Sequence, residues 1–184
     1  MMASNLINSA NFSWFIKMLM VAKEKTDSKI GYIQMPIEDI EFCENSFDAI
    51  ISSLAFHYIE SFEQIVEKVS GCLIPNGDFV FSVEHPVFTA FGSQDWYYDD
   101  NGNILHFPVD NYFFEGDRTA NFLGEKVIKY HKTLTTCLNS LIQRGIELTG
   151  IVDPQPSDYL LHTVKGMEDE LRRPMMLIVS AKKK

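Results

Sequence analysis

The chain has 184 residues, of which 46% are hydrophobic and 22% charged, and its formal net charge is −9. This length allows one domain with a buried core, and the acidic balance argues against a protein that follows a phosphate backbone. We therefore expect no nucleic-acid partner. Residues 14–21 are apolar but too short and interrupted to span a bilayer, so no membrane partner is expected either. Three separated cysteines without a CxxC pair favour a reducing, cytoplasmic location and exclude a disulfide framework.

Three elements are predicted in the first third of the chain. Residues 12–25 carry apolar side chains at helical spacing, with lysines towards the end where the helix dipole favours cations. Residues 30–35 alternate in the manner of a strand, and Pro36 ends the pattern. Residues 47–53 are apolar without alternation, which is typical of a strand buried on both faces of a parallel sheet.

A helix and a second strand follow directly. Residues 60–72 place four apolar side chains on one helical face, and a Pro-Asn-Gly turn at 75–77 precedes the strand at 78–83. This strand–helix–strand order with short connections predicts a parallel pair joined by a right-handed crossover. The chain is therefore expected to be an α/β protein.

The segment 86–130 breaks this alternation. Tyr97 and Tyr98, the turn at 100–102 and the apolar residues that follow it predict a β-hairpin. We interpret 86–130 as an inserted cover over the sheet. Beyond it, residues 132–144 predict a helix.

The last two predicted elements are strands, at 146–152 and 175–181.

Several short motifs follow one another along residues 16–181. They are Ile37-Glu38-Asp39, Phe47-Asp48, Ser52-Ser53, Leu73-Ile74-Pro75-Asn76-Gly77, Glu84-His85-Pro86, Tyr130-His131 and Arg172-Arg173-Pro174. Taken together and in this order, they resemble the class I S-adenosylmethionine (SAM)-dependent methyltransferases, in the type 11 small-molecule group.

The resemblance implies a Rossmann-like sheet, a single partial methyltransferase domain over residues 1–184, and SAM-dependent methyl transfer to a small-molecule acceptor. The family's first strand and glycine-rich turn have no counterpart, since the earliest glycine is Gly31. We therefore expect a sheet without its first strand or strands, a chain truncated at its N-terminus relative to the family, and impaired cofactor binding. The alternative is a non-catalytic remnant or partner subunit that acts by association, which predicts an oligomer.

The resemblance also implies a cofactor site at the carboxyl ends of the strands, where open α/β sheets bind ligands. Its expected members are Ile37, Glu38, Ser52, Ser53, Leu54 and His57. Backbone near Ile37 and the side chain of Glu38 would bind the adenine edge. The small Ser52 and Ser53 would let the methionine portion of the cofactor approach the backbone closely. The alternatives remain open: a solvated turn at Glu38, a strand cap at the serines and a packing role for His57.

Methyl transfer needs alignment of the reactants and removal of a proton from the acceptor. His85 and His131 are the candidate bases, and the expected acceptor-binding residues are Glu84, Tyr130, Arg172 and Arg173. The alternatives are a turn residue held by Glu84 for His85, packing for His131, and pairing with nearby acidic residues for the arginines. No metal is expected.

Overall fold

The computed structural model describes residues 12–26, 29–122 and 124–184. The helices and 3₁₀ turns are α1 (Phe12–Lys25), η1 (Ile37–Asp39), η2 (Phe56–Tyr58), α2 (Phe62–Cys72), α3 (Pro86–Ala90), α4 (Leu134–Gln143), α5 (Asp158–Thr163) and η3 (Met167–Arg172). The strands are β1 (Phe47–Ser53), β2 (Leu73–Glu84), β3 (Tyr97–Tyr98), β4 (Ile104–His106), β5 (Gly116–Phe122), β6 (Glu125–His131), β7 (Ile146–Val152) and β8 (Met176–Lys183).

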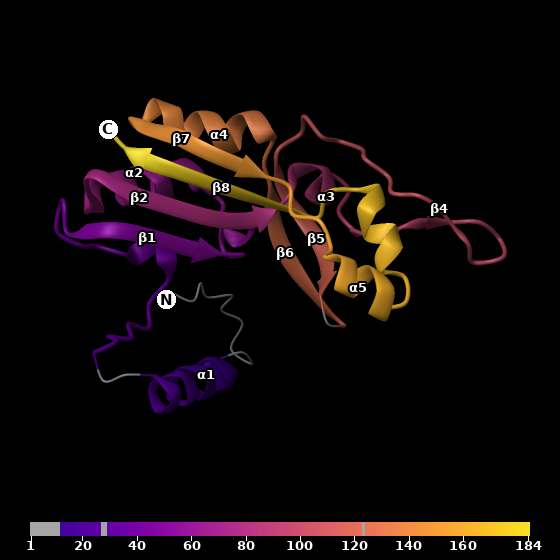
Figure 1. Cartoon of the computed structure of the whole chain (residues 1–184), viewed down its shortest axis with the longest axis horizontal. Coiled ribbons are helices and arrows are strands. Elements are labelled where there is room, and N and C mark those ends of the chain that lie inside the picture. Colours follow the sequence, from indigo (N-terminus) through magenta and orange to yellow (C-terminus); the bar gives the residue numbers. More distant parts are fainter. Residues whose placement is uncertain (1–11, 27–28, 123) are drawn as a thin grey trace.

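Four strands form the central sheet, in the order β1-β2-β8-β7 (Figure 1). β1 and β2 are parallel, as the strand–helix–strand pattern predicts, whereas β8 runs antiparallel to both of its neighbours. The chain therefore enters the sheet at one edge with β1, and its last strand lies between β2 and β7.

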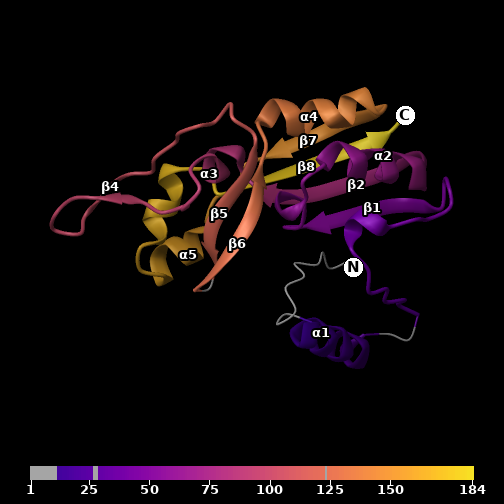
Figure 2. The same ribbon diagram turned by 180° about the vertical axis from the view of Figure 1, so that it is seen from behind.

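The core lies between one face of this sheet and the helices α2 and α4, which lie side by side over it (Figure 2). Alternate residues of β2 and β8 point into that core, and they include Phe79, Phe81, Leu177 and Val179. Helix α2 supplies the facing apolar side chains because its apolar residues recur at helical spacing. This packing fixes the two parallel strands relative to each other.

Two sequence predictions about the first strands are wrong. Residues 30–35 form no strand, and the part of the chain that the structure describes has no strand before β1. β1 is an edge strand rather than one buried on both faces, and Ile51 is 73% exposed. The missing strand at residues 30–35 and the exposed edge of β1 have one cause. A sequence pattern that is alternating or apolar produces a buried strand only where a neighbouring strand and a covering helix are present.

The segment 86–130 contains α3 and two hairpins, β3–β4 and β5–β6, at the carboxyl ends of β1 and β2 (Figure 1). The β3–β4 hairpin reaches furthest from the sheet, whereas β5–β6 lies beside the ends of the strands. In the described residues, no helix combines the length and the apolarity needed to cross a bilayer.

The Pro-Asn-Gly turn lies inside β2 instead of before it. Phe47 pairs with Leu73, but Ala49 pairs with Asp78, so the residues between bulge out of the β1–β2 ladder. Asn76 has a left-handed backbone with φ 64°, and Gly77 lies against the neighbouring backbone. A Cβ atom at Gly77 would come within 2.9 Å of the Ile74 carbonyl oxygen.

We expect Gly77→Ala to lower the free energy of unfolding by about 1–3 kcal/mol, because backbone atoms cannot move aside as a flexible side chain can. The added Cβ would also lie 3.1 Å from the Asp48 carbonyl oxygen of β1. Urea unfolding followed by circular dichroism measures the change. Gly71→Ala in α2 is the matched control, because no atom outside its own helical turn and chain neighbours lies within 4 Å of its Cβ position. An unchanged unfolding free energy for Gly77→Ala would contradict the close approach.

Candidate functional site

The carboxyl ends of the parallel strands β1 and β2 bring small polar groups together. The amide of Leu54 donates to the Ser82 carbonyl oxygen at 2.9 Å, which keeps the chain leaving β1 beside β2. Leu54 itself has a left-handed backbone with φ 50°. Ser52 is half-buried and Ser53 is exposed, with the Ser53 and Ser82 hydroxyl oxygens 3.5 Å apart. An open α/β sheet binds its ligands at this edge.

A cavity of about 180 Å³ lies on the helix-covered side of β1. It brings together the predicted cofactor residues Ile37 and Ser52, which lie 15 positions apart in the sequence. The rest of its wall is apolar or small: Ile40, Phe42, Phe47, Ala49, Ile50, Ile51, Phe56, Ile65, Val69 and Cys72. The side chain of Glu38 is exposed, and its carbonyl oxygen accepts from Lys68 Nζ.

His57 is buried in η2, where the backbone of β2 orients its ring. The amide of Glu84 donates to His57 Nδ1 at 3.3 Å, so the lone pair is on Nδ1 and the neutral ring carries its proton on Nε2. Burial lowers the pKa of His57 from 6.5 to about 4, against the opposing effect of Glu84 and with help from Lys129 and Lys132. His57 is therefore uncharged near neutral pH.

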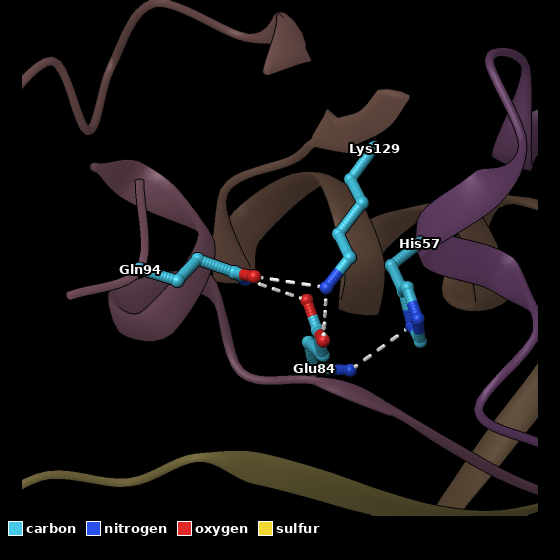
Figure 3. Close-up of polar contacts among 4 residues, drawn as sticks. All are labelled: His57, Glu84, Gln94 and Lys129. Atoms are coloured by element: carbon cyan, nitrogen blue, oxygen red, sulfur yellow. Dashed lines mark hydrogen bonds and ion pairs between the residues drawn. The ribbon is translucent and has the colours of Figure 1, made fainter. Parts of the chain in front are cut away.

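Glu84, at the end of β2, is engaged by two residues that the sequence reasoning missed (Figure 3). Lys129 Nζ lies 2.6 Å from Glu84 Oε1, and Gln94 Nε2 donates to Glu84 Oε2 at 2.7 Å. Lys129 points inward because β6 alternates, with Val127, Lys129 and His131 facing one way along the strand. The sequence carries no signal for this, because Ile128 stands on the opposite face of β6 and is more apolar than Lys129.

His85, a predicted base, has both ring nitrogens engaged. It is the N-cap of α3, where its Nδ1 accepts from the Val87 amide at 3.0 Å. Its Nε2 lies 3.5 Å from Asp153 Oδ1. Burial lowers the pKa of His85, and Asp153 opposes that effect. To act as a base, His85 would first have to release the Val87 amide, so its catalytic role stays a prediction.

His131, the second predicted base, is fully buried between α3 and the loop before β5. Its Nε2 lies 2.9 Å from the Tyr112 carbonyl oxygen, which only accepts, so Nε2 carries the proton. Its Nδ1 then accepts from the Thr89 hydroxyl at 2.7 Å. Burial is the main reason that its pKa is lowered. The catalytic role of His131 also stays a prediction.

Tyr130 and Lys132 line two further cavities. One, of about 20 Å³, is also lined by His57, Glu84 and Thr89. The other, of about 160 Å³, is also lined by Glu60, Glu63, Glu115 and Asp117. Lys132 donates to the Ile59 carbonyl oxygen, and burial lowers the pKa of this lysine. The structure thus gathers His57, Glu84 and Tyr130 around one small space.

Arg172 and Arg173 belong to a different cluster. Arg172 pairs with Asp169, and Arg173 makes two hydrogen bonds to Glu170. The guanidinium of Arg173 is buried and lies 4.6–4.8 Å from three aromatic ring centroids, those of Phe88, Trp96 and Phe107. A contact of Arg172 and Arg173 with an acidic acceptor stays a prediction.

Comparison with known proteins identifies relatives of this chain. A family model described as a methyltransferase domain matches residues 11–81. A Haemophilus influenzae protein of uncharacterised function is 32% identical over 157 residues, which cover 84% of this chain and 61% of that protein. The chain thus spans less than two thirds of this curated relative's length.

Two solved structures are more informative. A Listeria monocytogenes protein classed among the SAM-dependent methyltransferases is 50% identical, with a TM-score of 0.86 over 91% of this chain and 76% of that one. A SAM-dependent methyltransferase from Mesorhizobium loti is 35% identical, with a TM-score of 0.82 and the same coverage of both chains. These likenesses support SAM as the cofactor and a Rossmann-like sheet as the fold. The chain belongs to the SAM-dependent methyltransferase family.

Proposed function

We propose that this protein transfers a methyl group from SAM to a small-molecule acceptor bound between the carboxyl ends of β1 and β2 and the segment 86–130. The observation that carries the proposal is that Ser53 meets Ser82, and His57 meets Glu84, at the ends of two parallel strands. The 50% identity to a protein of this enzyme class supports it. Three unpaired cysteines, among the described residues, support a reducing, cytoplasmic location.

The residues present fit the cofactor by their chemistry. The apolar wall of the cavity of about 180 Å³ suits a flat heteroaromatic ring, and Ile37, beside Glu38, lies at this wall. Ser52, Ser53 and Leu54 offer short side chains and backbone groups where the methionine portion would lie. When bound, SAM supplies an electrophilic methyl group on a sulfonium. His57, uncharged near neutral pH, can lie near that positive sulfur without repelling it.

The acceptor side is formed by Glu84, Tyr130 and the segment 86–130. Glu84 is held by Lys129 and Gln94, so it contributes a fixed polar wall. His85 and His131 are proposed as the groups that take the acceptor proton, once a neighbouring donor releases the ring nitrogen. Alignment of the acceptor by these fixed groups is the main contribution of the protein to the rate.

A second candidate function is association without catalysis. β1 lies at the edge of the sheet in the described residues, and it contains no proline or lysine of the kind that protects edge strands. Ile51 is 73% exposed on this strand. An apolar, unprotected edge favours pairing with a strand of another chain.

The methyltransferase proposal predicts that the folded chain binds SAM and S-adenosylhomocysteine in isothermal titration calorimetry. Ser53→Leu should weaken both affinities at least about tenfold, or about 1.4 kcal/mol, because the longer side chain fills the space at the end of β1. Thr149→Leu, on the exposed edge strand β7, is the matched control and should bind as the natural protein does. A folded sample that binds neither molecule would refute the proposal.

The association proposal predicts an oligomer or complex by size-exclusion chromatography with light scattering. Ile51→Lys should dissociate it, because a buried, unpaired charge at the new interface is costly. Thr149→Lys at the opposite edge of the sheet should leave the mass unchanged. A natural chain that runs as a monomer and methylates an acceptor would exclude this second function.

A further inference from the structure

Two buried lysines lie close together in the sequence, and their surroundings differ. Lys129 is 2% exposed, and its Nζ lies 2.6 Å from Glu84 Oε1, so its charge has a partner (Figure 3). Lys132 is 9% exposed and makes no ion pair with any carboxylate of the described residues. A buried charge without a partner is costly, so the surroundings of Lys132 favour the neutral amine.

The hydrogen bonds of Lys132 fit a neutral amine. Its Nζ donates to the Ile59 carbonyl oxygen at 2.5 Å and to the Tyr130 carbonyl oxygen at 3.5 Å. The same atom lies 5.6 Å from the centroid of the Tyr130 ring. An –NH2 group has two N–H donors and one lone pair, whereas –NH3⁺ has three donors. Two carbonyl oxygens therefore occupy both donors of the amine and leave its lone pair unused.

The carboxylates around Lys132 oppose this preference only weakly. Glu60, Glu63, Glu115 and Asp117 line the cavity of about 160 Å³ beside it, and all four residues are exposed. Water and salt screen exposed charges, and Glu115 Oε1 already accepts three hydrogen bonds from the start of α4. Burial outweighs these carboxylates and lowers the pKa of Lys132.

The other titratable groups at Lys132 add no net charge. Cys137 stays a thiol, because burial raises its pKa to about 12. Burial also lowers the pKa values of His57 and His131, so both rings are uncharged near neutral pH. Glu84 is already paired with a lysine.

Lys132 also lies where the methyl acceptor is expected. It follows β6 directly and lines the cavity of about 20 Å³ together with His57, Glu84 and Tyr130. It lines the cavity of about 160 Å³ as well, which has room for several non-hydrogen atoms of a small molecule. The side chain therefore contacts both the space at His57 and a cavity that can hold part of an acceptor.

We propose that Lys132 is a catalytic residue: its Nζ, as a neutral amine, takes the proton of the methyl acceptor. This inference rests on the proposed function and deepens it. The Nδ1 atoms of His85 and His131 are each bound to a donor, whereas the lone pair of Lys132 needs no release. The acceptor is then a molecule whose nucleophilic oxygen or nitrogen carries a proton.

The step balances without another reagent. The X–H bond of the acceptor breaks, its proton goes to Nζ, and its electron pair forms the new bond to the methyl carbon. The carbon–sulfur pair stays on sulfur, which leaves S-adenosylhomocysteine. The resulting –NH3⁺ loses its proton to water at the exposed carboxylates of the cavity of about 160 Å³.

The first test measures the protonation of each lysine of the natural chain by competitive acetylation. Trace acetic anhydride is applied in short pulses from about pH 6 to about pH 10, and mass spectrometry of peptides quantifies each acetylated lysine. The anhydride reacts only with a neutral amine, so the rate rises with pH until the amine is deprotonated and then stays constant. Lys132 should reach this plateau within the range, whereas the exposed Lys126 and Lys165 should still be rising at its upper end.

Lys129 is the matched control for burial. It is even less exposed but is paired with Glu84, so it should show no plateau in this range. Near-UV circular dichroism reports whether the fold is kept at each pH. A Lys132 profile that keeps rising with that of Lys126 would overturn the proposal, as would the absence of acetylation at Lys132 at every pH.

A second test asks whether the amine acts in methyl transfer. Methyl-labelled SAM and a bacterial small-molecule extract are the probes, and labelled products are quantified. Lys132→Ala should lower the rate of transfer at least about 100-fold, the usual effect of losing a positioned base. Methylamine should restore part of this rate, because it places an amine in the space of the deleted side chain. Lys132→Arg should stay slow, since a guanidinium has no lone pair to offer.

The outcomes separate this inference from the proposed function. A folded Lys132→Ala variant that keeps its rate, or loses it without rescue by methylamine, would overturn the catalytic role. If Lys132→Ala does not fold, Lys132→Met keeps the length of the side chain and should show the same loss. If the natural chain transfers no methyl group, the proposed function fails, while the acetylation profile still decides whether Lys132 carries a lone pair.

Discussion

The parallel pairing of β1 and β2 is the constraint on which the site depends. It runs from Ala49 and Asp78 to Ser53 and Ser82, and α2 supports it from one face. Because both strands end together, the residues after β1 meet those after β2, and Leu54 and His57 each bond to β2. A small shift of this register would separate His57 from Glu84. The bulge at Gly77 sets this register, so it helps to position the site.

The ionisable side chains of this site are either uncharged or paired with an opposite charge. The site holds three neutral histidines, His57, His85 and His131, each with its acceptor nitrogen already bound to a donor. The charges of the buried Lys129 and the partly buried Glu84 cancel each other. These groups therefore add no net positive charge to the candidate site near neutral pH.

The sequence predicted those elements correctly whose apolar face packs against another element of the structure. The parallel pair, α2 and α4 follow from apolar periodicity because each apolar face meets another. Residues 30–35 have a strand-like pattern but no strand, since pairing is a property of two segments and not of one. Lys129 escaped notice because a lysine in a strand normally points to solvent, and only the inward alternation of β6 reverses that expectation.

The position of β8 has a consequence for how this chain folds while it is being synthesised. β8 is the last strand in the sequence, yet it lies between β2 and β7 and pairs with both. While the ribosome is still adding these residues, β2 and β7 each have an edge without its neighbour, and unpaired edges are where nascent chains aggregate. The sheet becomes continuous only after translation reaches β8, so folding of the whole sheet is a late, cooperative event. Loss of a few residues from β8 would split the sheet in its middle rather than trim its edge.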